Sequence, residues 1–189
     1  AKVEATGPAF HLHSGIVAPY ILHYGTEAQK QRWLPGMCAG EIIGAIAMTE
    51  PGAGSDLQGM RARAVREGDD YVLNGQKTFI SNGQIADLVI TVAETDPDAG
   101  AKGTRLLVAE RGDAGFTRGR NLEKVGWHAQ DTSELFYSDV RLPADRLLGD
   151  ENRAFKYLMQ ELAQERLIVA IRSITTLETA VANTVAYTR

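Results

Sequence analysis

The strongest constraint on the fold is the C-terminal segment, residues 153–189, which contains neither proline nor glycine. These two residues are the least favourable inside a helix, so their absence predicts one long helix, with Asp150 as its N-cap. Phe155, Leu158 and Leu162 share one face at helical spacing, while residues 167–171 are apolar nearly all round. Such a helix is buried among several partners. The chain offers only one other long helical candidate, near its N-terminus. The chain also starts without methionine, so we interpret it as a piece of a longer polypeptide.

Upstream of this helix the pattern is that of short strands. Apolar and polar residues alternate over residues 61–67, a turn follows at 68–70, and residues 71–73 lead to Asn74-Gly75, which together indicate hairpins. Strands of this length with turns between them favour an antiparallel barrel or sandwich, and the fold class is α+β. Residues 94–103, with several Asp, Pro and Gly, form a surface loop. Further strands are expected at residues 77–81, 87–93, 105–110 and 133–141.

Thr26 followed by Gln29 is a capping box that opens a helix through about Leu34, where Pro35 and Gly36 end it. His11, His13 and His23 precede this helix, but no Cys or carboxylate completes a metal-ligand set at useful spacing. We expect these histidines at the surface or at the edge of the core, and no metal.

Composition excludes several classes of protein. The net charge is -4 and no basic block is visible, which argues against nucleic acid as a partner. No apolar run is long enough for a membrane span, and the N-terminus is not a signal peptide. The single cysteine, Cys38, excludes an internal disulfide, fits a reducing compartment and is expected to pack in the core.

A glycine loop follows the apolar segment at residues 42–48. It holds Pro51, Gly52 and Gly54, with hydroxyls at Thr49 and Ser55 on either side. Glycines let the backbone approach a flat or phosphorylated ligand, and loop amides and hydroxyls offer uncharged hydrogen bonds. The loop therefore suits a cofactor, although an ordinary strand-to-turn junction has the same composition.

A second candidate is the strand at residues 76–83. Phe79 and Ser81 are two residues apart, which places them on the same face of a strand. One could stack on a ligand while the other donates a hydrogen bond. The alternative is a core phenylalanine beside a serine at the end of a strand.

A third candidate is Glu165 in the long helix. At about 100° per residue it falls beside Leu158 and Val169, at the edge of the apolar stripe. A partly desolvated carboxylate has a raised pKa and is suited to accept a proton. The alternative is an ion pair with a basic residue of a partner helix.

Four motifs in this order resemble the acyl-CoA dehydrogenases: Met-Thr-Glu-Pro-Gly-Ala-Gly-Ser-Asp at 48–56, Leu-Asn-Gly-Gln-Lys at 73–77, Phe-Ile-Ser-Asn-Gly at 79–83 and Asp-Thr-Ser-Glu-Leu-Phe at 131–136. The resemblance covers the chain from about His13 to Arg189. It implies the end of an N-terminal helical domain at residues 1–42, a middle β-barrel domain at 43–147 and the first helix of a C-terminal helical domain at 148–189. It also implies FAD as cofactor and a homotetramer.

The resemblance also assigns roles. FAD would contact Ile46, Met48, Thr49, Ser55, Phe79, Ile80 and Ser81, and the substrate would contact Ser55, Gln164 and Arg166. Phe79 stands where many members have Trp, and Ser81 where many have Thr. The long-chain and isovaleryl subfamilies place the catalytic base on this helix in a Glu-Arg pair. Glu165 is therefore the expected base, with Arg166 steering the CoA end, and Glu161 is expected to matter much less.

The implied reaction is the FAD-dependent oxidation of an acyl-CoA thioester, most like the long-chain type, to trans-2-enoyl-CoA in fatty-acid β-oxidation. An electron-transfer flavoprotein would accept the electrons, in the bacterial cytoplasm or the mitochondrial matrix. The alternatives are an acyl-CoA oxidase or flavin monooxygenase on the same scaffold, and a barrel used only for binding or assembly.

Overall fold

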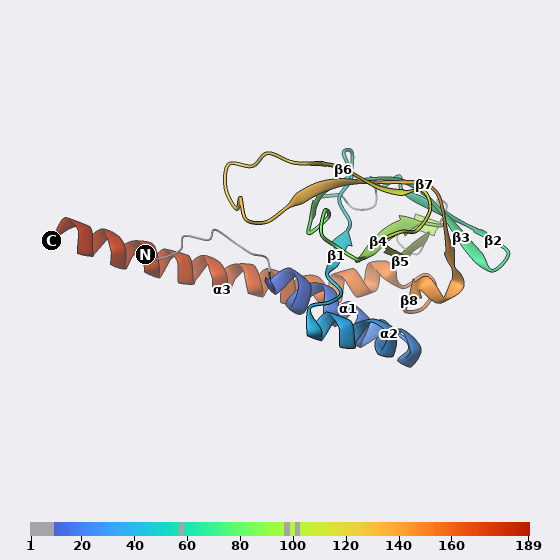
Figure 1. Cartoon of the computed structure of the whole chain (residues 1–189), viewed down its shortest axis with the longest axis horizontal. Coiled ribbons are helices and arrows are strands. Elements are labelled where there is room, and N and C mark those ends of the chain that lie inside the picture. The colour runs from blue at the N-terminus through green and yellow to red at the C-terminus, as the bar shows by residue number, and fades with distance from the viewer. Residues whose placement is uncertain (1–9, 57–58, 97–98, 101–102) are drawn as a thin grey trace.

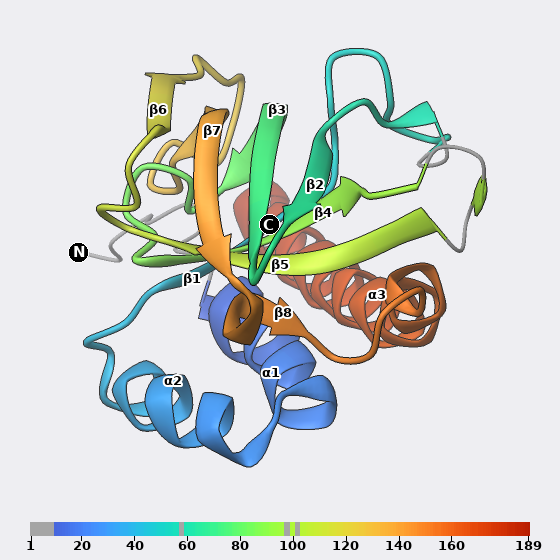
Figure 2. The ribbon, with the colours of Figure 1, turned by 90° about the vertical axis from the view of Figure 1, so that its right-hand side faces the viewer.

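A twisted sheet lies over a layer of helices in the computed structural model, which describes residues 10–56, 59–96, 99–100 and 103–189 (Figures 1 and 2). The α+β class is confirmed. The helical elements are η1 (Leu12–Val17), α1 (Ala18–Tyr24), α2 (Glu27–Ala39), η4 (Ala144–Arg146) and α3 (Ala154–Thr188). The strands are β1 (Gly44–Ala47), β2 (Arg63–Glu67), β3 (Asp70–Ser81), β4 (Leu88–Glu94), β5 (Thr104–Glu110), β6 (Phe116–Asn121), β7 (Thr132–Pro143) and β8 (Leu147–Leu148).

The capping box that opens α2 is confirmed. Thr26 Oγ1 accepts from the Gln29 amide at 3.2 Å, and Gln29 Oε1 accepts from the Thr26 amide at 2.9 Å. The predicted end of this helix is wrong, because Pro35 lies inside it and the helix continues to Ala39. Proline removes one backbone donor, but the face with Trp33 and Met37 is buried and holds the last turns in place. The helix ends at Gly40, whose φ of 75° is left-handed.

The closed β-barrel expected for residues 43–147 is not found: among the described residues the sheet is open, with strand order β6-β7-β3-β2-β4-β5-β8 and β1 beside β4. It is not wholly antiparallel, because β1 pairs with β4 in parallel and β2 makes one parallel bridge to β4. Local turn patterns predict pairing only between strands that follow each other directly in the sequence. Parallel partner strands are instead joined by long crossover connections, which no turn pattern marks. Neither these pairs nor the short strands β6 and β8 were expected from the pattern.

The β2–β3 hairpin is confirmed, but Asn74-Gly75 is not a turn. Strand β3 runs through both residues to Ser81, with a register shift against β7 between Leu73 and Gly75. Gly75 has a φ of 145°, and a Cβ on it would lie 2.7 Å from the Ala62 Cα. The glycine therefore permits a close approach of two backbone segments. Of the predicted loop at residues 94–103, residues 97–98 and 101–102 lie outside the described residues.

The part of the sheet around β4 is buried on both faces. The face toward the helices packs Ile90 and Val92 of β4 with Tyr20 of α1 and Leu158 of α3. The opposite face packs Val89 of β4 with other strands. Because both faces are covered, β4 is an almost continuous apolar run rather than an alternating one.

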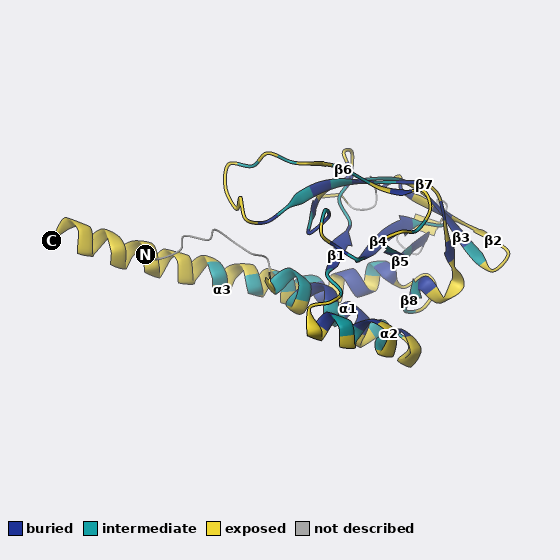
Figure 3. Ribbon diagram, in the orientation of Figure 1, coloured by how far each residue is buried: buried dark blue, intermediate teal, exposed yellow. Residues whose placement is uncertain are grey.

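The long C-terminal helix α3 is confirmed, and only its first turns are buried (Figure 3). Its later apolar side chains are exposed, including Leu167, Ile171, Ile174, Leu177, Val181 and Val185. Asp150 is not its N-cap, because Arg153 occupies that position and the Asp150 carboxylate accepts from the Tyr157 hydroxyl at 3.2 Å. Within the described part of the chain, no helix has the length and apolar character that crossing a bilayer requires.

Candidate functional site

The glycine loop after β1 is a tight turn whose outer side is open. Glu50 and Ala53 exchange two backbone hydrogen bonds at 2.9 and 3.1 Å, which closes the turn around Pro51 and Gly52. A Cβ placed on Gly52 or Gly54 would meet no atom within 4 Å. The two glycines are therefore not needed for packing inside the described chain, and their backbone is free to approach a ligand.

A buried ion pair between Lys77 and Glu50 joins this loop to strand β3. Lys77 is 0% exposed, and its Nζ donates to Glu50 Oε1 at 2.8 Å and to the Met48 carbonyl at 2.9 Å. The Glu50 carboxylate also accepts from the amides of Arg61 and Ala62, at 2.6 and 2.9 Å. Burial lowers the pKa of Lys77, and the neighbouring carboxylate opposes this shift. No local pattern marks this pair, whose signal in the sequence is a lysine in a strand and an acid in the glycine loop.

Phe79 lies beside the loop on a distorted part of β3. The Thr78 amide donates to the Thr49 carbonyl at 2.9 Å, which joins the second candidate segment to the first. Between Lys77 and Ile80 the pairing with β7 shifts register, and Phe79 has a φ of 59°. This left-handed conformation is rare for a bulky residue. Phe79 is 66% exposed, so the alternative of a core phenylalanine is wrong.

The other predicted cofactor contacts differ in burial. Ile46 and Ile80 are buried, Met48, Thr49 and Ser81 are half-buried, and Ser55 is exposed. Ile46 belongs to the apolar cluster between the sheet and the helices that also contains Tyr20 and Leu158. The strand that carries the loop and the helix that carries Glu165 therefore pack into one core.

Glu165 is half-buried on α3, and its Oε1 accepts a hydrogen bond from the Tyr20 hydroxyl of α1 at 3.1 Å. Burial raises the pKa of Glu165, whereas the Tyr20 hydrogen bond opposes the rise. None of the ion pairs between described residues involves Glu165, so the alternative of an ion pair is not realised within them. Gln164 and Arg166 are exposed. A half-buried carboxylate of raised pKa is chemically suited to take a proton.

Glu161 lies one turn earlier and is committed to structure. Its Oε1 lies 2.9 Å from His23 Nδ1 and accepts from the Tyr24 hydroxyl at 2.9 Å. The Tyr24 ring stacks on Tyr157 with centroids 3.9 Å apart. This carboxylate therefore fastens α1 to the start of α3. The roles of Tyr20 and Tyr24 as hydrogen-bond donors to these carboxylates were not predicted, because the sequence pattern does not distinguish them from other apolar positions of a short helix.

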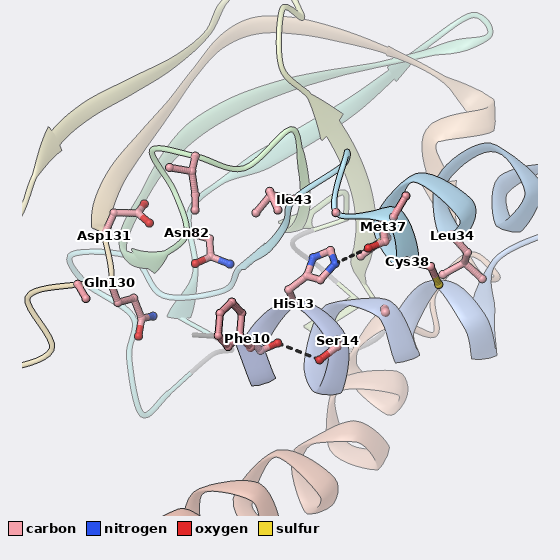
Figure 4. A pocket seen from close by; sticks show the side chains of 15 residues that line it. Phe10, His13, Ser14, Leu34, Met37, Cys38, Ile43, Asn82, Gln130 and Asp131 are labelled. Atoms are coloured by element: carbon pink, nitrogen blue, oxygen red, sulfur yellow. Dashed lines mark hydrogen bonds between the residues drawn. The ribbon is translucent and has the colours of Figure 1, made fainter. Parts of the chain in front are cut away.

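A separate cavity of about 620 Å³ lies between the N-terminal helices and the loops after β3 and before β7 (Figure 4). Phe10, His13, Met37, Ile43, Asn82 and Gln130 line it, among others. None of the predicted site residues is in its lining. Cys38 also lines it and is exposed, so the expectation that it packs in the core is wrong. The surface of the C-terminal turns of α2 is open to solvent at this point.

The three N-terminal histidines lie at the surface or core edge, as expected. His13 Nδ1 accepts from the Gly44 amide at 3.1 Å, and its Nε2 lies 3.0 Å from the Met37 carbonyl (Figure 4). Since Nδ1 accepts, Nε2 carries the proton and donates. His13 thereby joins α2 to the start of β1.

Two domain models of one protein family match successive parts of the chain. Residues 45–140 match the family model described as acyl-CoA dehydrogenase, middle domain, and residues 1–41 match acyl-CoA dehydrogenase, N-terminal domain.

Individual relatives extend this agreement. The mitochondrial long-chain specific acyl-CoA dehydrogenase of Mus musculus is 57% identical over 94% of this chain and 42% of its own length. Cyclohex-1-ene-1-carbonyl-CoA dehydrogenase of Geobacter metallireducens is 44% identical over 82% of this chain and 41% of its own length. The crystal structure of an acyl-CoA dehydrogenase from Geobacillus kaustophilus superposes with a TM-score of 0.83 at 60% identity, covering 85% of this chain and 43% of that one. The chain thus spans less than half the length of these relatives.

Proposed function

Because the chain belongs to the acyl-CoA dehydrogenase family, we propose that the complete polypeptide is an FAD-dependent enzyme that oxidises acyl-CoA thioesters to trans-2-enoyl-CoA. In this proposal residues 1–42 end a helical domain, residues 43–147 form the middle domain and residues 148–189 begin a C-terminal helical domain. The identity to a long-chain specific relative supports long-chain thioesters as substrates.

The loop after β1 and the strand beside it have the chemistry that a flavin needs. The proposal assigns to FAD the backbone of Ile46 and Met48, the hydroxyls of Thr49 and Ser81 and the exposed ring of Phe79. These groups supply uncharged hydrogen bonds and an aromatic wall, and the open space over Gly54 admits a flat ligand. Ile80, whose exposed fraction is 3%, anchors the strand behind them. When bound, FAD supplies the acceptor for the hydride that leaves the β-carbon of the acyl chain.

Glu165 is the proposed base for the α-proton of the thioester. The observation that carries this assignment is its half-buried carboxylate, whose pKa is raised by burial and which the Tyr20 hydroxyl orients at 3.1 Å. A base works best when its pKa lies near the working pH, and burial moves a carboxylate in that direction. The Tyr20 hydrogen bond favours the ionised form, which is the form that accepts the proton.

Arg166, Gln164 and Ser55 are the proposed contacts for the CoA part of the substrate. All three are exposed, which suits groups that meet a large, charged, solvated ligand at the mouth of a site. Arg166 can pair with phosphate oxygens through several N–H donors at once. The electron acceptor in this proposal is an electron-transfer flavoprotein, the assembly is a homotetramer, and the location is the bacterial cytoplasm or the mitochondrial matrix, since relatives of both origins match.

The test is Glu165→Gln in the complete enzyme, with Glu161→Gln as the matched control one turn away. We expect Glu165→Gln to lower kcat with palmitoyl-CoA by at least about 100-fold while FAD stays bound, because a general base contributes that much or more. Glu161→Gln should lose far less, since its partners are structural. Turnover that survives Glu165→Gln in an FAD-loaded protein would refute the base assignment. A protein that is colourless even after FAD is added would instead favour a non-catalytic module.

A further inference from the structure

A second hollow lies farther along the same face of α3 as Glu165. Positions 165, 169, 172 and 176 are spaced by four, three and four residues, so they follow one face of the helix. The hollow, of about 840 Å³, contains Val169, Arg172 and Thr176 from this face in its lining. The connection between β6 and β7 reaches over α3 and supplies the opposite wall with Val125 and Trp127 (Figure 1).

Arg172 is the unusual feature of this hollow. Its guanidinium carbon lies 3.3 Å from the centroid of the Trp127 ring, a cation–π contact. Its Nη1 is buried and has no hydrogen-bond partner among the described residues. None of the described residues that line the hollow is acidic. A buried guanidinium donor without an acceptor costs free energy, which a ligand with an acceptor oxygen would recover.

The arrangement around Arg172 is held by further contacts. Trp127 has a φ of 58°, a left-handed conformation that a bulky residue adopts only when its surroundings enforce it. The ring of His11 meets Trp127 edge-on at 6.3 Å. Burial and, second, the charge of Arg172 lower the pKa of His11. The single guanidinium of the hollow favours a ligand with a single negative charge.

The hollow also has apolar walls. Val125, Val169 and Leu177 are in its lining together with Trp127, beside the polar but uncharged side chains of Ser173 and Thr176. Apolar walls with one unpaired cation match an alkyl chain that ends in a carboxylate, because the chain covers the walls while the carboxylate pairs with the guanidinium.

We propose that this hollow binds the far end of an ω-carboxyacyl thioester, so that dicarboxylic acyl-CoA molecules are substrates. The inference rests on the proposed function, since it requires the thioester end to lie at Glu165. Arg172 lies seven positions after Glu165 on the helix, which is an axial distance of about 10 Å at 1.5 Å per residue. A short diacid cannot span this distance, so the preference should appear only for medium-length and longer chains.

The experiment compares dodecanedioyl-CoA with dodecanoyl-CoA in the complete, FAD-loaded enzyme. The readouts are the ratio of the two kcat/KM values and the ratio of the two Kd values, the latter by calorimetry on Glu165→Gln. We expect Arg172→Met to lower both preferences for the diacid by about tenfold or more, the worth of a hydrogen bond to a charged group. Arg172→Lys should keep part of the preference, because it keeps the charge but loses the planar donors.

Arg153→Met is the matched control, since Arg153 is exposed at the start of the same helix and pairs only at 3.6 Å with Asp150. Its ratios should equal those of the wild type. The inference is overturned if the wild-type enzyme turns over dodecanoyl-CoA but does not prefer the diacid, or if Arg172→Met leaves both ratios unchanged in a protein that still binds FAD. If neither thioester is turned over, the proposed function itself fails.

Discussion

Lys77→Met should destabilise the protein more than any exposed lysine substitution, because it leaves the buried carboxylate of Glu50 without its counter-ion. Lys77 is fully buried and Glu50 is 6% exposed, so water cannot take over the lost contact. Removing one partner of a buried ion pair costs about 3–5 kcal/mol. Glu50 keeps its backbone donors at Arg61 and Ala62, which places the expected loss of unfolding free energy at the lower end, about 3 kcal/mol.

The assay is denaturant unfolding of the complete protein, followed by circular dichroism, with the midpoint converted through the slope of the transition. Lys156→Met, an exposed lysine on α3, is the control and should change the unfolding free energy by less than about 0.5 kcal/mol. Adding Glu50→Gln to Lys77→Met should recover part of the loss, because a neutral amide needs no counter-ion. A loss below about 1 kcal/mol for Lys77→Met, the size of an exposed ion pair, would refute the reasoning.

Two further predictions follow from single contacts. Tyr20→Phe removes the hydrogen bond that favours the charged form of Glu165, so the pKa of Glu165 rises further and the acid limb of the kcat/KM profile moves to higher pH. Tyr24→Phe, the matched change on the same helix, should leave the limb in place, and equal shifts in both variants would contradict the assignment. Gly75→Ala should cost about 1–3 kcal/mol, measured by thermal unfolding, because its φ is 145° and the new Cβ would lie 2.7 Å from the neighbouring backbone. Gly68→Ala, at a φ of 63° with open space around it, should cost less.

The elements that the sequence predicted well are those defined by local chemistry. The capping box at Thr26 depends on two side chains three residues apart, and the structure has both hydrogen bonds. Helix α3 depends on the absence of helix breakers, and it extends from Ala154 to Thr188. Helical geometry alone places Glu165 at the edge of an apolar stripe, and burial at that position raises its pKa.

Where local chemistry and packing disagreed, packing decided. Pro35 was expected to end α2, but the burial of Trp33 and Met37 keeps the helix intact to Ala39. Asn74-Gly75 has the composition of a turn, yet pairing with β2 and β7 keeps it within a strand, where Gly75 permits the close approach of another backbone segment. These outcomes depend on contacts between residues distant in sequence, which no local pattern contains.

The sequence by itself determined the α+β class, the long helix and the motifs that carry the family resemblance, because each depends on residues a few positions apart. Only the tertiary structure decided which side chains meet. It paired Tyr20 with Glu165 across 145 positions and joined Lys77 to the glycine loop through Glu50. It also stacked Arg172 on Trp127, with one guanidinium donor that has no partner in the described part of the chain. The physical reason is that burial and hydrogen-bond partners are properties of the assembled layers, where helix meets helix and sheet, and they set the charge state and reach of every candidate group.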